Sequence, residues 1–168
     1  SLLAQKSAAQ VGAVIPGAAA MEQLGRANIA VVGARDLVPG ASVRLHGIKT
    51  FDKQRIDLAI LYAASVLIEG CDTLRDVFMT IIQGKMLFKV ENLETLPGYG
   101  FTAWVNNNRV IVGNRAFMQQ QGLEIPSLDY ENRYTKGKRL PIYLAVSGRL
   151  FAMFLVSYKA NVQVAATL

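Results

Sequence analysis

The sequence is poor in the residues that build disulfides, zinc sites and imidazole-based catalytic sites. It has one cysteine, Cys71, and one histidine, His46, in 168 residues. A single cysteine excludes a disulfide or a cysteine-rich zinc site within one chain, and a lone thiol fits a reducing compartment. His46 lies in the segment VRLHGI, which we interpret as a strand, and no carboxylate is near it in the sequence. We therefore expect His46 to be a structural or surface residue.

Long apolar segments are also absent. No run of 18 uninterrupted apolar residues occurs, so we expect no helix that spans a bilayer. No charged amino-terminal region with a following apolar stretch and cleavage site is visible, so we expect no signal peptide. The 52% hydrophobic content is ample for one packed domain. Because the sequence begins at Ser1 within an expected helix, we interpret it as a soluble piece of a longer chain.

The positively charged residues are spread along the chain. The formal net charge is +6, and such an excess is compatible with nucleic acid, anionic lipid or a small anionic ligand. The lysines and arginines are scattered except for Lys136, Lys138 and Arg139. No aromatic platform is interleaved with this cluster, so we interpret it as a solvated loop and expect no nucleic-acid partner.

The stretch Pro97–Asn114, PGYGFTAWVNNNRVIVGN, has the clearest pattern in the chain. Gly98 and Gly100 predict a turn in which the backbone takes positive φ angles and approaches a partner closely. The apolar residues that follow alternate with polar ones, which predicts two strands. The three asparagines at positions 106–108 predict the turn between these strands, because asparagine tolerates left-handed conformations.

The second of these strands is expected to end at a glycine and to lead into a helix. Gly113 breaks the alternation, and Asn114 is placed to cap a helix that begins near Arg115. A GxG motif is weak without its context. Taken alone, it favours no more than a glycine-punctuated hairpin that feeds a helix.

The order of these features resembles the nucleotide-binding domain of P-type cation-transporting ATPases, and the heavy-metal-transporting class most closely. Upstream, GAAAMEQLGRANIAVV looks like the segment that leads into the phosphorylation site of that family. Downstream, YLAVSGRLFAMFLVS looks like the final hairpin before the chain returns to the phosphorylation domain. The resemblance spans nearly the whole chain. We predict an α/β (α+β) fold, with helices packed on an antiparallel sheet of about six strands.

The resemblance implies a binding site for ATP. The residues that it implicates are Glu69, Gly98, Gly100, Phe101, Gly113 and Asn114. The first two glycines and Phe101 would offer backbone amides to the nucleotide, Gly113 and Asn114 would form the opposite wall, and Glu69 would accept from the adenine amine. The intact parent would use Mg²⁺ with ATP. It would also place this piece at the cytoplasmic face of a membrane, beside the phosphorylation, actuator and membrane domains of the same polypeptide.

The phosphorylation motif of the family is missing from this chain. The family has D-K-T-G-T after the strand that matches IAVV, and its aspartate is the nucleophile that accepts the γ-phosphate. Ala34 stands at the aspartate position, and Asp36, the only nearby carboxylate, lacks the following Lys-Thr-Gly. The segment Phe51-Asp52-Lys53 looks like the start of that motif, but a helix follows it at once. We interpret Asp52 as the N-cap of this helix.

Two further family motifs are altered. Glu69 matches the first glutamate of the family pattern, but the Ser-Glu-His-Pro motif that should follow is replaced by Gly-Cys-Asp-Thr-Leu. Loss of one side-chain contact of about 1–3 kcal/mol weakens binding roughly ten- to a hundredfold. In the D-x-x-R hinge after the last hairpin, Tyr158 and Asn161 replace the aspartate and the arginine.

The remaining segments predict the elements around this site. Apolar residues at helical spacing predict a buried helix that ends at Glu69-Gly70. Thr73 and Asp76 are placed to form a capping box for a second helix. Further strands are expected at 88–96, 140–146 and 149–156, and further helices at 18–24, 115–121 and 128–138, with a strand at 28–32. We divide the chain into residues 1–40 and 158–168 of a phosphorylation domain and residues 41–157 of a nucleotide-binding domain.

Two functions remain open from the sequence. The first is an ATP-binding domain of a heavy-metal-transporting ATPase. The second is a catalytically inactive relative that keeps the fold as a regulatory or interaction module, because three motifs are altered together.

Overall fold

A computed structural model describes residues 11–14 and 42–159 of the chain. The helix expected at 18–24, the strand expected at 28–32 and the segment around Asp36 lie outside the described residues. Among the helices that are described, none is long and apolar enough to cross a membrane.

The described strands form one antiparallel sheet in the order β1-β2-β7-β6-β5-β4-β3. Six of its seven strands lie between residues 42 and 159, which confirms the predicted sheet, and β1 adds an edge strand beside β2. The bounds are β1 Val11–Val14, β2 Ser42–Thr50, β3 Val90–Leu96, β4 Gly100–Val105, β5 Asn108–Gly113, β6 Leu140–Val146 and β7 Arg149–Lys159.

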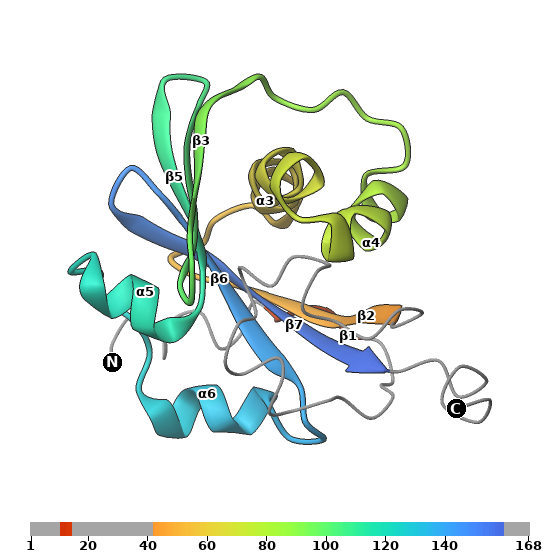
Figure 1. The fold of residues 1–168 in the computed structure, drawn as a ribbon. Helices are drawn as coiled ribbons and strands as arrows, with labels where there is room; N and C mark the ends of the chain where they lie inside the picture. Colours follow the sequence, from red (N-terminus) through yellow and green to blue (C-terminus); the bar gives the residue numbers. More distant parts are fainter. Residues whose placement is uncertain (1–10, 15–41, 160–168) are drawn as a thin grey trace.

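Helices cover both faces of the sheet, as Figure 1 shows. The pair α3 (Ile56–Gly70) and α4 (Asp72–Ile82) lies on one face, where the larger of two apolar clusters sits. The short helices α5 (Arg115–Gln120) and α6 (Leu128–Tyr134) lie on the other face over the smaller cluster. Because strand side chains alternate between faces, neighbouring residues of β5, β6 and β7 contribute to both clusters.

The start of α3 differs from the prediction. The N-cap of α3 is Arg55, not Asp52, and Arg55 makes no side-chain cap hydrogen bond. Asp52 and Lys53 instead form a left-handed turn with φ angles of 54° and 57°, closed by a bond from the Gln54 amide to the Phe51 carbonyl. The cause is Phe51, which is fully buried and forces the chain to reverse before a helix can begin.

The capping box predicted for α4 is also wrong. Helix α4 begins at Asp72 with Cys71 as its N-cap and has no side-chain cap. The Thr73 hydroxyl is buried and has no hydrogen-bond partner in the described structure. Asp72 pairs with Arg75 instead, at 2.7 Å. Only Cys71 separates the two helices, so Thr73 lies inside α4 and cannot act as its N-cap.

Both predicted hairpins are present. Asn106 and Asn107 have φ angles of 51° and 64° and make the two-residue turn between β4 and β5, so Asn108 already belongs to β5. Ser147 and Gly148 make the corresponding turn between β6 and β7, with φ angles of 51° and 79°.

Several ends of elements differ from the predicted bounds. Strand β3 begins at Val90 rather than at residue 88, and α6 ends at Tyr134 rather than at residue 138. Strand β7 continues to Lys159, beyond the expected end at Val156, because its last residues pair with the first residues of β2.

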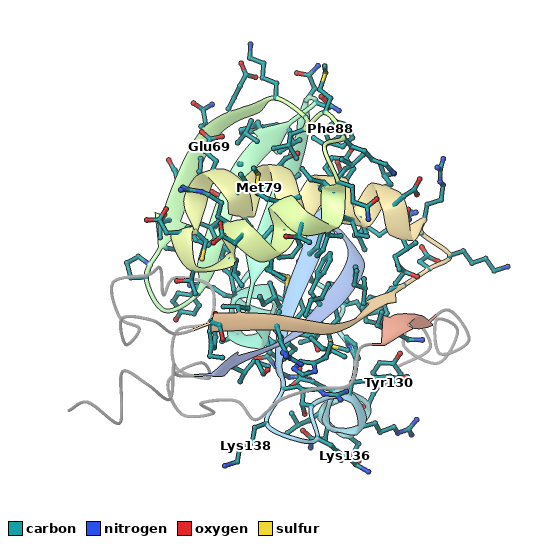
Figure 2. The ribbon with its side chains drawn as sticks, turned by 90° about the vertical axis from the view of Figure 1, so that its right-hand side faces the viewer. Glu69, Met79, Phe88, Tyr130, Lys136 and Lys138 are labelled. Carbon is teal, nitrogen blue, oxygen red and sulfur yellow. The ribbon has the colours of Figure 1, made fainter. Side chains whose placement is uncertain are left out.

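The single histidine is structural. His46 is fully buried in β2, and its Nε2 atom lies 2.6 Å from the Ser157 hydroxyl on β7. The hydrogen bond therefore ties the two strands together beside a register shift. The lysines of the expected solvated loop, Lys136 and Lys138, are exposed and point away from the molecule (Figure 2).

Candidate functional site

Two glycines of the implied site lie opposite each other on neighbouring strands. Gly100 begins β4, Gly113 ends β5, and the two are register partners. A β-carbon at Gly100 would lie 2.1 Å from the Val112 carbonyl oxygen, and one at Gly113 would lie 2.3 Å from the Tyr99 carbonyl oxygen. Neither position can therefore hold a side chain unless the backbone moves. The close approach that glycine allows here is between two strands of this chain.

Gly98 has a different environment. It lies in the turn between β3 and β4 with a φ of +83°, and a β-carbon there would meet no atom within 4 Å. The positive φ confirms the predicted turn conformation. The open space beside Gly98 is the feature of this loop pair that leaves backbone accessible to a ligand.

Asn114 holds the two loops together. Its side-chain Nδ2 donates to the Gly98 carbonyl at 2.8 Å, and its backbone amide donates to the Tyr99 carbonyl at 3.0 Å. Its Oδ1 accepts from the Phe117 amide at 2.9 Å and so caps α5 as predicted. Both ends of the side-chain amide are therefore engaged within the protein.

Glu69 and Phe101 come from neighbouring elements. Glu69 is exposed on the last turn of α3 (Figure 2). A β-carbon on the next residue, Gly70, would lie 3.2 Å from the Phe101 ring, so the end of α3 packs beside the start of β4. Phe101 is only 1% exposed. Because Phe101 lies between paired residues of β3 and β5, neither its ring nor its backbone is open to a ligand in this structure.

The fold thus brings the six implied residues to one end of the sheet. Gly100, Gly113 and Asn114 interlock through contacts with the protein itself, while Gly98 and Glu69 face open space or solvent. Among the residues that the structure describes, no group of three or more histidine, cysteine, aspartate or glutamate side chains could hold a metal ion.

The junction of α3 and α4 lacks an imidazole, as the sequence indicates. Cys71 stands there instead and is fully buried, and its burial raises the pKa of the thiol. Asp72 is exposed and bound to Arg75. The residues Cys71 and Asp72 therefore offer no imidazole or other aromatic side chain to a ligand beside Glu69.

A buried charged network on the other face has no signal in the sequence. The Glu131 carboxylate on α6 is 8% exposed and accepts from the Tyr143 hydroxyl at 2.6 Å and from Arg115 at 3.1 Å. Burial is the main cause that raises the pKa of Tyr143, and the nearby Glu131 charge raises this pKa further. Arg115 is the first residue of α5, directly after Asn114. The network thus fixes the helix that Asn114 caps.

A buried lysine was also missed. Lys49 on β2 is fully buried, and its Nζ lies 5.9 Å from the centre of the Tyr134 ring, within the range of a cation–π contact. Burial lowers the pKa of Lys49 to about 8. No sequence pattern around VRLHGIKT distinguishes this lysine from an exposed one.

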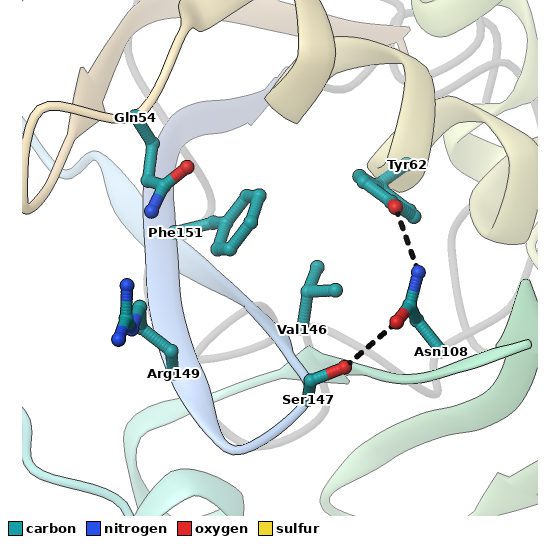
Figure 3. Close-up of a pocket in the computed structure, with 7 residues that line it drawn as sticks. All are labelled: Gln54, Tyr62, Asn108, Val146, Ser147, Arg149 and Phe151. Atoms are coloured by element: carbon teal, nitrogen blue, oxygen red, sulfur yellow. Dashed lines mark hydrogen bonds between the residues drawn. The ribbon is translucent and has the colours of Figure 1, made fainter. Parts of the chain in front are cut away.

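A separate cavity of about 320 Å³ opens at the far end of the sheet (Figure 3). Its lining residues are Gln54, Tyr62, Asn108, Val146, Ser147, Arg149 and Phe151. None of them was singled out from the sequence as a ligand-binding residue, because they come from separate segments of the chain.

The fold places the chain in a known structural class. The fold is similar to that of the N-domains of two copper-transporting P-type ATPases and to part of a zinc-transporting PIB-type ATPase, as comparison with solved structures shows. No protein-family model and no curated protein matches the sequence.

Three solved structures illustrate this likeness. The chain is similar to the N-domain of HMA6, a copper-transporting P-type ATPase, at 19% identity and a TM-score of 0.54, over 71% of this chain and 99% of that one. The chain is also similar to the N-domain of HMA8, another copper-transporting P-type ATPase, at 15% identity and a TM-score of 0.53, over 66% of this chain and 96% of that one. A zinc-transporting PIB-type ATPase gives 19% identity and a TM-score of 0.58 over 97% of this chain, which spans 27% of that protein.

Proposed function

We propose that residues 41–157 are the ATP-binding domain of a P-type cation-transporting ATPase of the heavy-metal class. The observation that carries the proposal is the loop pair at one end of an N-domain fold. There Gly98 stands open with a positive φ, and Asn114 bonds to its carbonyl at 2.8 Å. A preorganised backbone with space beside it suits a ligand that is recognised by main-chain groups.

In this proposal the two loops form the walls of a shallow nucleotide site. Gly98 lies nearest the nucleotide on one side, with the buried backbone of Gly100 and Phe101 behind it, and Gly113 with Asn114 forms the other wall. Glu69, exposed at the end of α3, accepts a hydrogen bond from the adenine amine. ATP brings Mg²⁺ with its phosphates, because phosphate oxygens are the hard ligands that Mg²⁺ prefers.

The remaining parts of the chain belong, in the same proposal, to a neighbouring domain. Residues 1–40 and 158–168 are pieces of the phosphorylation domain and its hinge. The parent polypeptide supplies actuator and membrane domains and holds this domain at the cytoplasmic face of a membrane. The chain spans 27% of the zinc-transporting ATPase that it resembles, which leaves room for those parts.

A specific observation favours a second function, that of a non-catalytic module with weak or no nucleotide binding. The α3–α4 junction carries a buried Cys71 and an exposed Asp72–Arg75 pair where the family has its histidine. The Asn114 side chain is already engaged at both ends. A loss of about 1–3 kcal/mol in contacts weakens binding roughly ten- to a hundredfold.

An ATP titration followed by calorimetry and by backbone amide chemical shifts separates the two functions. The first expects saturation near millimolar or tighter, with shifts centred on Gly98, Gly113 and Glu69. The second expects no saturable shifts there at high ATP.

A matched pair of variants shows whether any binding uses this loop. Gly98→Ala and Gly122→Ala place the same methyl group at positive φ angles, +83° and +75°, and neither meets an atom within 4 Å. ATP affinity should fall in Gly98→Ala and stay unchanged in Gly122→Ala, which lies after α5. Equal affinities in both variants would remove the Gly98 loop from the site.

A further inference from the structure

The cavity at the far end of the sheet is separate from the proposed nucleotide site. Asn108, which lines the cavity, pairs with Val105, whereas Gly113 pairs with Gly100. The two places are therefore five residues apart along the hairpin, or about 17 Å at the usual rise of a strand. A ligand in the cavity would touch none of the residues assigned to ATP.

The cavity has apolar surface in its middle and polar groups on both sides (Figure 3). Phe151 and Val146 lie between Gln54 and Arg149 on one side and Tyr62, Asn108 and Ser147 on the other. The rings of Tyr62 and Phe151 meet edge to face, with centroids 5.8 Å apart. This pair makes a firm aromatic corner against which a flat group can pack.

One polar wall is locked by its own hydrogen bonds. Asn108 Nδ2 donates to the Tyr62 hydroxyl at 3.1 Å, and the Ser147 hydroxyl donates to Asn108 Oδ1 at 3.0 Å. Tyr62 therefore acts as an acceptor, and its own O–H proton has no partner among the described residues. The wall is preorganised and presents a hydroxyl donor to a ligand.

The opposite wall supplies a cation. Arg149 lies 3.5 Å from Asp52, and the two side chains are 63% and 42% exposed, so this ion pair is weak and can be displaced. The guanidinium keeps further N–H donors in a planar fork that suits a carboxylate. Within the described structure, the side-chain amide of Gln54 makes no hydrogen bond and can add another donor.

We propose that this cavity binds a small planar carboxylate, with the ring against Phe151 and the carboxylate on Arg149. An aromatic corner, a hydroxyl donor and one displaceable cation select a flat apolar body with a single negative end. The cavity volume of about 320 Å³ is at the lower end of ligand cavities and has room for a ligand of the size of benzoate. The proposal does not depend on whether the chain binds ATP.

Benzoate, titrated into the full chain and followed by backbone amide shifts, tests the proposal. Saturable shifts are expected at Gln54, Asn108 and Arg149, with half-saturation at roughly 1–10 mM for so small a ligand. The Gly98 and Gly113 amides should not move. Benzamide, which has the same shape without the charge, should bind at least tenfold more weakly.

A charge-matched pair of variants provides the control. Arg149→Gln should weaken benzoate binding at least tenfold, because it removes the cation and leaves a side chain of similar length. Lys89→Gln removes the same charge from a side chain that is 82% exposed and outside the cavity, and should leave the affinity unchanged.

Three results would overturn the proposal. The first is the absence of saturable amide shifts at benzoate concentrations well above about 10 mM. The second is benzamide binding with the same affinity as benzoate. The third is an equal loss of benzoate affinity in Arg149→Gln and Lys89→Gln. A parallel ATP titration keeps the two sites distinct, because its shifts are expected at the Gly98 loop and it should not displace benzoate.

Discussion

At Gly100 a single methyl group is enough to push two strands apart. The added β-carbon of Gly100→Ala would lie 2.1 Å from the Val112 carbonyl and 2.7 Å from the Gly113 α-carbon, both backbone atoms. We expect Gly100→Ala to lower the free energy of unfolding by about 3 kcal/mol, since the backbone must move to relieve the clash. Urea denaturation measures this loss.

Gly98→Ala is the control for that experiment. Its β-carbon meets nothing within 4 Å, so only the strain of a φ of +83° remains, at about 1 kcal/mol. Similar losses in both variants would mean that the β4–β5 contact is looser than the structure shows.

Asn114 should contribute more to stability than an ordinary helix cap. Asn114→Ala removes the cap of α5 and also the bond to the Gly98 carbonyl, for an expected loss of about 2 kcal/mol in the free energy of unfolding. Ser127→Ala removes only the cap of α6, where Ser127 accepts from the Tyr130 amide, and should cost about 1 kcal/mol. Equal losses by urea denaturation would show that the bond to Gly98 adds nothing.

The sequence predicted single residues well where the reason was local. Asn114 was found because a glycine, an asparagine and a helical segment follow one another, and a cap depends on those neighbours alone. Asp52 and Thr73 were assigned by the same rule and wrongly, because the surrounding structure decided each case. Phe51 is buried against Tyr130 from α6, with ring centroids 6.3 Å apart, and this burial turns the chain at Asp52.

At the scale of elements, the Arg115–Glu131–Tyr143 network joins α5, α6 and β6. Burial raises the pKa of Tyr143, and also that of Tyr158 on β7. An unfolded tyrosine has a pKa near 10, so above that pH the unfolded chain releases protons that the folded chain keeps. Stability is therefore complete below pH 10 and falls as the pH rises, by about 1.4 kcal/mol per pH unit for each tyrosine.

Tyr143→Phe tests this pH dependence. The variant should lose stability at pH 7, by about 1–3 kcal/mol, because the buried Glu131 loses a hydrogen-bond donor. Above pH 10 it should show a shallower decline than the native chain. Urea unfolding between pH 7 and 11.5 measures both effects, and an unchanged slope would mean that Tyr143 ionises as readily in the folded protein as in the unfolded one.

The hairpins were the most predictable elements. Their turns are set by two adjacent residues that accept positive φ, Asn106 with Asn107 and Ser147 with Gly148. The ends of β3 and β7 differ from the predicted bounds because residues of other strands, with which they pair, determine them. Strand β7 continues only because β2, more than 100 residues earlier, is there to pair with it.

At the scale of the whole molecule, the sequence predicted the sheet and the clustering of the six implied residues through the resemblance to a family. The fold likeness to copper- and zinc-transporting ATPase domains supports the first of these. The benzoate-sized cavity could not be predicted, because Tyr62, Asn108 and Arg149 meet only after α3 and both hairpins are in place. Lys49 was missed for the same reason, since its burial depends on packing against Tyr134.

Strand β7 continues two residues beyond the predicted domain boundary at residue 157. Tyr158 is fully buried in the larger apolar cluster and pairs with Val43, and Lys159 pairs with Ser42. A chain cut after Ser157 should therefore unfold at a lower urea concentration than one cut after Lys159. The expected difference in the free energy of unfolding is about 2–3 kcal/mol, which is the contribution of burying one large side chain. If the two chains unfold at the same midpoint, the last pairs between β2 and β7 do not contribute to the domain, and the boundary at residue 157 stands.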